Sequence, residues 1–125
     1  MDTNLRKGAH GEQAACRYLE NKGWSILARN WRVGRDELDI VARDGDVLVV
    51  VEVKTRASEE YGLPQESVGV VKQHRLIRAA EAYLDQVGED LDVRFDIISV
   101  VLHPSGPRLE HIEEAFYPTP DEHTE

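Results

Sequence analysis

Apolar residues near the N-terminus recur at spacings of three and four, which is the period of an amphipathic helix. They are Leu5, Ala9, Cys16 and Leu19. Glu12 fills the remaining position of this stripe, and Gly23 is a natural stop at its C-terminal end. We therefore predict a helix over residues 4–22 that directs one carboxylate towards the core.

Three short segments of alternating or continuous apolar residues come next. They predict strands over residues 24–33, 37–43 and 47–55. Alternation places Trp24, Ile26 and Ala28 on one face of the first strand. Asp44 and Gly45 are typical of a tight hairpin turn, which makes the second and third strands antiparallel neighbours. A run of valines predicts that the third strand is buried on both faces.

A second helix and two further strands complete the predicted chain. The helix begins near Ser67, ends near Val87 and carries its own apolar stripe. The strands are predicted over residues 92–102 and 109–116. This order indicates an α/β sandwich, in which helices flank a mixed central sheet of four to five strands. We expect one domain over residues 1–117, followed by an acidic tail over residues 118–125.

The net charge of −9 is distributed unevenly along the chain. Residues 1–56 carry 10 basic and 9 acidic residues, whereas residues 57–125 carry 5 basic and 15 acidic residues. An acidic surface disfavours nonspecific binding of nucleic acid, which usually involves a basic surface. Most of the negative charge, however, lies outside the N-terminal half, so nucleic-acid binding by that half is not excluded.

Cysteine content and hydropathy exclude several classes of protein. The single cysteine, Cys16, excludes an internal disulfide and a cysteine-based zinc site. No apolar segment is long enough to span a bilayer, and residues 1–7 lack the apolar stretch of a secretory signal. We therefore expect a cytoplasmic protein with no membrane partner.

Charged residues interrupt the second and third predicted strands. Glu37 and Asp39 share one face of the second strand. Glu52 and Lys54 share one face of the third, and the hairpin turn makes the two pairs neighbours. Such charges are costly in a sheet unless they are paired or bound to a metal ion. Mg²⁺ and Mn²⁺ prefer carboxylate oxygens, so Asp39 and Glu52 predict a metal site, beside which Lys54 could stabilise charge on a phosphate.

Glu12 adds to this prediction, because a lone carboxylate that faces the core is unfavourable without a partner. A metal ion shared with Asp39 and Glu52 would explain its position. The competing interpretation is a salt-bridge ladder, since a Glu-x-Lys pattern alone occurs on many exposed strands. The features together favour a catalytic site of Asp39, Glu52, Lys54 and Glu12, with Glu12 as a third metal ligand. Glu37 and Gln65 could support it, Gln65 by contacting a metal-bound water.

Basic residues near this site could contact the phosphates of a nucleic acid. They are Arg29, Arg32, Arg56 and Lys72. Solvated side chains are the alternative interpretation for each arginine. Lys72 belongs to a series with Arg75 and Arg78 that forms either a basic ridge or the solvated face of the second predicted helix.

Motifs along most of the chain resemble those of the YraN family, small bacterial proteins of the restriction-endonuclease-like superfamily. They are Gly11-Glu12, Asn30-Trp31-Arg32, Glu37-Leu38-Asp39-Ile40-Val41-Ala42, Val51-Glu52-Val53-Lys54-Thr55-Arg56, Tyr61-Gly62, Lys72 and Arg94-Phe95-Asp96. The resemblance implies a restriction-endonuclease-like fold and a relationship to archaeal Holliday-junction resolvases. In those relatives a helix glutamate, a strand aspartate and a Glu-x-Lys motif form the site, and the matching residues are Glu12, Asp39, Glu52 and Lys54. One departure is Asp36, where the family usually has glycine.

Three hypotheses of function follow. The first is a metal-dependent endonuclease that uses Mg²⁺ or Mn²⁺ to hydrolyse phosphodiesters in DNA, with structured or branched DNA among its candidate substrates. An enzyme of this kind that cuts paired strands would act as a homodimer. The second is a catalytically silent nucleic-acid-binding or adaptor module with the same fold. The third is a protein-interaction module that uses the acidic C-terminal half.

Overall fold

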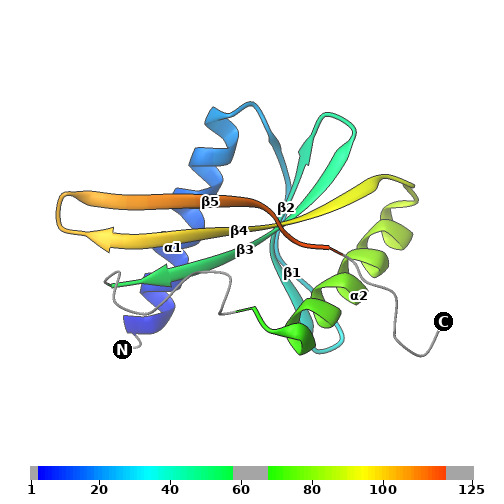
Figure 1. The fold of residues 1–125 in the computed structure, drawn as a ribbon, viewed down its shortest axis with the longest axis horizontal. Helices are drawn as coiled ribbons and strands as arrows, with labels where there is room; N and C mark the ends of the chain where they lie inside the picture. Colours follow the sequence, from blue (N-terminus) through cyan, green and yellow to red (C-terminus); the bar gives the residue numbers. More distant parts are fainter. Residues whose placement is uncertain (1–2, 58–67, 118–125) are drawn as a thin grey trace.

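The computed structural model describes residues 3–57 and 68–117, and there it forms a five-stranded sheet with a helix on each face (Figure 1). In chain order the elements are α1 Thr3–Asn21, β1 Ser25–Val33, β2 Asp36–Asp44, β3 Val47–Arg56, α2 Val70–Val87, β4 Asp92–His103 and β5 Gly106–Phe116. Gln65, Ser67 and the predicted acidic tail lie outside the described residues, so the predicted domain division stays a prediction. Neither of the described helices is long and apolar enough to cross a membrane.

The sheet has the strand order β1-β2-β3-β4-β5. Neighbouring strands are antiparallel except for β3 and β4, which are parallel and joined by the crossover that contains α2. The predicted α/β sandwich on a mixed sheet is therefore confirmed. The edge strand β5 is longer than predicted, because pairing with β4 continues from Phe116 back to Gly106 at the turn.

Two separate cores hold the helices against the sheet. On one face Ala15, Cys16 and Leu19 of α1 pack on the middle strands. On the other face, buried residues of α2, among them Leu76 and Tyr83, pack against β2, β3 and β4. The valines of β3 alternate between these two cores, which confirms that this strand is buried on both faces.

An irregularity in β1 changes which residues share a face. Ile26 packs in the core under α1, whereas Ala28 packs against the core under α2, because the register with β2 shifts between them. Trp24 and Ile26 share a face as predicted, but the prediction that Ala28 lies on that face with them is wrong. A β-bulge adds one residue to one strand of a pair, so it reverses the alternation beyond it. Asn30 has a positive φ of 50°, and beyond it Trp31 packs against the core under α2 and contacts Tyr83 edge to face, with ring centroids 5.2 Å apart.

Candidate functional site

Pairing of β2 with β3 brings the predicted carboxylates together. Ile40 lies opposite Val51, and Asp39 and Glu52 occupy the next position along each strand. There the Asp39 side chain, rather than its backbone, continues the contact between the strands. Its Oδ2 accepts a hydrogen bond of 2.9 Å from the backbone N–H of Val53. Asp39 is thus fixed beside Glu52 at the end of the antiparallel ladder.

The surroundings of Asp39 disfavour its charged form. Burial is the main cause, and repulsion from Glu52 adds to it; the hydrogen bond from Val53 and the charge of Lys72 act in the opposite sense. The net effect raises the pKa of Asp39 from 3.8 to about 7. A raised carboxylate pKa in a pocket is typical of functional sites, because a cation bound there would relieve the repulsion.

A third carboxylate comes from α1, beside a point where the helix approaches β3 closely. A Cβ atom at Gly11 would lie only 1.9 Å from Oγ1 of Thr55, so the contact requires glycine. Glu12 follows directly and is half-buried, and its charge raises the pKa of Asp39 further. The helix stripe predicted the position of Glu12, whereas Gly11 stood out only as part of the Gly11-Glu12 motif and its close approach to Thr55 was not predicted.

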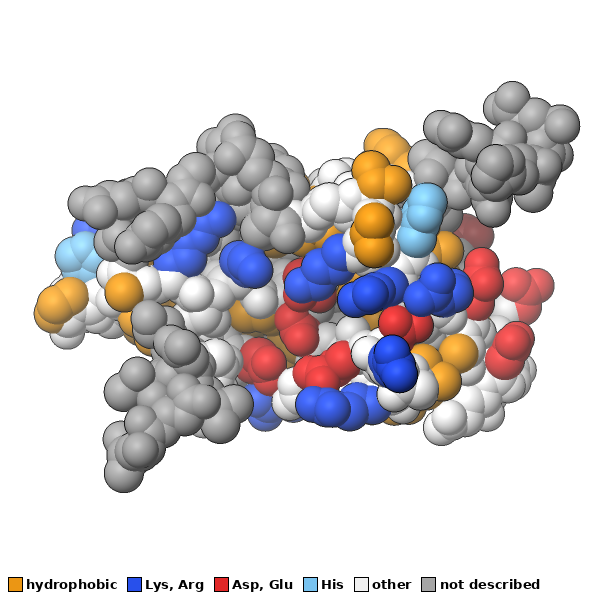
Figure 2. Space-filling view, turned by 90° about the horizontal axis from the view of Figure 1, so that it is seen from below, with side chains coloured by type: hydrophobic (Ala, Val, Ile, Leu, Met, Phe, Trp, Pro, Cys, Tyr) orange, Lys and Arg blue, Asp and Glu red, His pale blue; other side chains and the backbone are white. Residues whose placement is uncertain are grey.

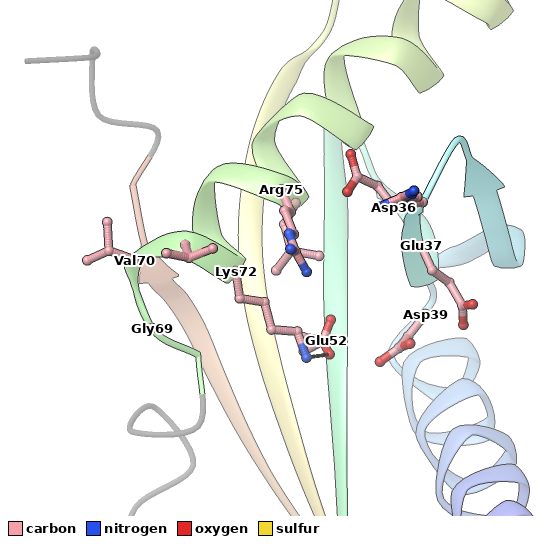
Figure 3. A pocket seen from close by; sticks show the side chains of 11 residues that line it. Asp36, Glu37, Asp39, Glu52, Gly69, Val70, Lys72 and Arg75 are labelled. Atoms are coloured by element: carbon pink, nitrogen blue, oxygen red, sulfur yellow. Dashed lines mark ion pairs between the residues drawn. The ribbon is translucent and has the colours of Figure 1, made fainter. Parts of the chain in front are cut away.

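Glu52 has a cationic partner that the sequence did not predict. Nζ of Lys72, from the first turn of α2, lies 2.6 Å from Oε1 of Glu52 (Figure 3). The Glu52 side chain is only 8% exposed, whereas that of Lys72 is 42% exposed. Lys54 shares a face of β3 with Glu52 by alternation and is half-buried. Within residues 8–57 and 68–117, however, Lys54 forms no ion pair.

These side chains open into a pocket of about 720 Å³ between β2, β3 and the start of α2. Its acidic residues are Asp36, Glu37, Asp39 and Glu52. Its basic residues are Arg35, Lys72 and Arg75. Glu37 and Asp39 extend from β2 on one side of Glu52, and Lys72 and Arg75 approach from α2 on the other (Figure 3). On the molecular surface, acidic side chains are likewise bordered by lysines and arginines (Figure 2). Such a pocket can hold a cation and an anion next to each other.

Neighbouring ion pairs secure the rim of the pocket. Arg32 is paired with Glu37 at 2.8 Å, and Arg78 of α2 is paired with Asp36 at 3.4 Å. Asp36 stands where the resembling family usually has glycine, and here it links β2 to α2. The tight turn before it is made at Gly34, which has a positive φ of 58°.

The residues predicted to contact phosphates lie in different places. Lys72 lies in the pocket, and Arg32 is attached to its rim through Glu37. Arg29 lies near the core under α1, where its charge lowers the pKa of Cys16 against the larger effect of burial. Arg56 ends β3 and has an interaction of its own. The pocket also contains Arg35 and Arg75, of which Arg75 belongs to the predicted basic series on α2.

A second group of polar residues lies on β4 and β5. The ligating atoms of Asp96, His111 and Glu113 all lie within 4.8 Å of one another, so this group could hold a metal ion. Among the described residues it is the one group of three that is this compact; Glu12, Asp39 and Glu52 stand further apart. Sequence spacing did not reveal this group, because it depends on how β4 and β5 pair.

The acidic side chains of this second group already have positively charged or hydrogen-bonding partners within the protein. Asp96 accepts hydrogen bonds from Arg94 at 2.9 and 3.0 Å and from the backbone of Glu114 at 3.1 Å, and it contacts His111 at 2.7 Å. Burial alone would raise the pKa of Asp96, but hydrogen bonds from His111 and Arg94 outweigh it and hold the pKa below its usual value. Lys22 pairs with Glu113 at 3.4 Å. A divalent ion would have to displace these positive groups, so the geometry favours a structural role here.

Known proteins resemble this chain over almost its full length. Residues 11–100 match the family described as Uncharacterised protein family UPF0102. A UPF0102 protein of Syntrophus aciditrophicus is 49% identical over 117 residues, which cover 93% of this chain and 92% of the relative. One from Bacteroides thetaiotaomicron is 50% identical over 111 residues, or 89% and 92%. One from Rhodococcus jostii is 44% identical over 118 residues, or 93% and 100%. The YraN-like resemblance is thus confirmed, and the chain belongs to the UPF0102 family.

Proposed function

We propose that this protein is a metal-dependent endonuclease that hydrolyses phosphodiester bonds in DNA. The observation that carries the proposal is the pair Asp39 and Glu52, two carboxylates that adjacent strands hold together at the floor of a pocket lined by cations. A structural ion pair needs one carboxylate and one cation. Asp39 and Glu52 have a single lysine beside them, which contacts Glu52 from the side of α2, so a metal ion would supply compensation that the two carboxylates lack.

The donor set suits Mg²⁺ or Mn²⁺, which prefer hard oxygen ligands. Asp39 and Glu52 would hold the ion, and Glu12 would act from α1 as an outer or additional ligand. Asp39 Oδ2 is engaged by Val53, so its other oxygen remains for a ligand. Such an ion supplies Lewis acidity at a phosphate when it is bound.

The basic residues would bind and orient the substrate. Arg35 and Arg75 lie in the pocket, where guanidinium groups can form paired hydrogen bonds to a phosphate. Lys54 lies on the same face of β3 as Glu52, where its ammonium group would stabilise charge that develops on the phosphate. Because the phosphate backbone is common to all DNA, these contacts do not select a sequence. A symmetric cut of paired strands would require two copies of the chain.

The second candidate function is a catalytically silent nucleic-acid-binding or adaptor module. The Lys72–Glu52 ion pair favours it, because this lysine neutralises Glu52 without any metal. The net charge of −9 also points to weak binding of DNA.

Cleavage assays with Mn²⁺ and Mg²⁺ separate the two functions. The substrates should be duplex, single-stranded, flap and four-way DNA, each with wild type, Asp39→Asn and Glu52→Gln. We expect metal-dependent cleavage of at least one substrate by wild type and none by either variant, because an amide is a poor ligand for a hard cation. Cleavage that persists in folded Asp39→Asn would refute the proposed site. Metal binding by wild type without any cleavage would favour the silent module.

A further inference from the structure

We propose that Lys72 occupies the cation position of the site when no metal is bound, and that a metal ion displaces it into the pocket, where it binds the substrate phosphate. This inference rests on the proposed function, since it concerns the same carboxylates. It assigns to Lys72 two alternating partners, Glu52 and a phosphate group, and it makes the binding of metal and of DNA mutually dependent.

The ion pair itself is the first reason. Lys72 Nζ lies 2.6 Å from Oε1 of Glu52, whose side chain is 8% exposed. A carboxylate buried to this degree is strongly unfavourable without a cation. Lys72 satisfies that need with a single positive charge, although Glu52 has a second carboxylate, Asp39, next to it. The lysine therefore compensates only part of the charge that a divalent ion would compensate fully.

The second reason is that Lys72 and a metal ion cannot share Glu52 favourably. A divalent ion on the Glu52 carboxylate would lie within a few ångströms of the ammonium group, and the two would repel each other strongly in a partly buried site. Once two carboxylates hold a divalent ion, their charge is compensated and the lysine loses its electrostatic partner. The ion pair would then exchange for the metal contact.

The third reason is that the displaced side chain has a place to go. Lys72 is 42% exposed, and its flexible four-carbon chain starts from the first turn of α2 at the pocket wall. Arg75 lies on the same side of the pocket, and Arg35 also lines it. A third positive charge beside these two would be unfavourable alone and favourable with a phosphate bound. Metal binding therefore prepares the pocket for DNA.

Titration calorimetry of Mn²⁺ binding tests the exchange without any measure of activity. Lys72→Gln removes the charge and keeps hydrogen-bonding capacity, and Lys72→Met is the second variant if the first folds poorly. We expect either to bind Mn²⁺ roughly tenfold more tightly than wild type, a typical size for coupling between two ligands. Arg78→Gln is the matched control, because it removes the same charge from the same helix at the ion pair with Asp36. It should change affinity less than twofold.

The second half of the test concerns DNA. Binding of a short duplex to wild type should tighten several-fold when Ca²⁺, a cation that seldom supports cleavage, replaces EDTA. In Lys72→Gln this gain should be clearly smaller than in wild type, because no ammonium group is released. Unchanged or weaker Mn²⁺ binding by both Lys72 variants, with normal binding by wild type, would overturn the inference and leave the proposed function intact. Absence of Mn²⁺ binding in wild type and variants alike would overturn both. Binding by the variants alone would support the exchange.

Discussion

Asp96 is a buried aspartate and Asp39 is a half-buried one, and the surroundings of the two differ. Asp96 lies among donors: two hydrogen bonds from Arg94, one from a backbone N–H and contact with His111 hold its pKa below the usual value. Asp39 has one backbone donor and two acidic neighbours, and its pKa is raised to about 7. The charges of the first region are therefore compensated within it, whereas the second has only Lys72, which pairs with Glu52, beside two carboxylates. A buried carboxylate indicates a site only when its own fold leaves it under-compensated.

Asp96→Asn should have the largest effect on folding. It removes the charge that pairs with Arg94, a side chain only 17% exposed, and loss of one partner of a buried pair costs about 3–5 kcal/mol. Urea denaturation at pH 7 would measure the change in the free energy of unfolding. Asp44→Asn is the matched control, because Asp44 meets the same arginine at 4.0 Å with a side chain 46% exposed. It should cost less than about 1 kcal/mol. Equal losses of unfolding free energy in the two variants would contradict the special structural role of Asp96.

Lys54→Ala should lower the rate of DNA cleavage by about 10²–10³ while metal binding is retained. The reason is that Lys54 is expected to stabilise charge on the phosphate rather than to hold the ion. Single-turnover cleavage combined with Mn²⁺ titration would measure both quantities. A wild-type rate in Lys54→Ala would show that Lys54 has no role in catalysis and that its role, like that of Asp96, is structural.

The two aspartates should also respond to pH in opposite directions. The folded pKa of Asp39 lies above its ordinary value of 3.8, so raising the pH from about 4 to 7 ionises the unfolded carboxyl first and lowers stability. The folded pKa of Asp96 lies below 3.8, so its contribution is present above that pH and is lost as the pH falls through the folded value. Urea midpoints from pH 3 to 8 should decline less towards neutrality in Asp39→Asn than in wild type. A superimposable profile would contradict the raised pKa.

The smallest effect concerns the salt dependence of DNA binding. If about three phosphates are neutralised, the logarithm of affinity should fall with the logarithm of salt concentration at a slope of about −2.7. Arg75→Gln should reduce the magnitude of that slope by about 0.9, because Arg75 lies in the pocket. Lys22→Gln, which alters the Asp96 region instead, should leave it unchanged. A smaller slope in Lys22→Gln, with an unchanged slope in Arg75→Gln, would indicate that DNA binds near Asp96 and not in the pocket.

Sequence reasoning succeeded where the determinants are local. The hairpin turn was predicted from Asp44 and Gly45, and in the structure Gly45 and Asp46 form it while Asp44 pairs with Val47. The predicted antiparallel pairing of β2 with β3 is confirmed, and it makes Asp39 and Glu52 neighbours. It failed for β1, where the register shift after Ile26 leaves no local sign in the alternation and reversed the assigned face. The resulting lesson is that period two predicts a face only as far as the next bulge.

The ion pairs could not be predicted from the sequence for a different reason. Lys72 reaches Glu52 only after α2 has docked on the sheet, and twenty residues separate the two along the chain. His111 meets Asp96 through the register of β4 and β5, fifteen residues apart. Helix spacing and strand alternation describe one element at a time, so they cannot predict contacts that depend on the docking of two. The pattern identified which residues carry chemistry but not which cation each would meet.

The contact at Gly11 has a consequence for redesign of this scaffold. Because a single methyl group there would collide with Thr55, residue 11 sets the distance at which α1 can approach β3. An alanine would push the helix outwards unless Thr55 were shortened as well, and Glu12 would move with it. The two positions therefore act together as a spacer, and a paired substitution at 11 and 55 offers a way to adjust how near the third carboxylate stands without altering any charged residue.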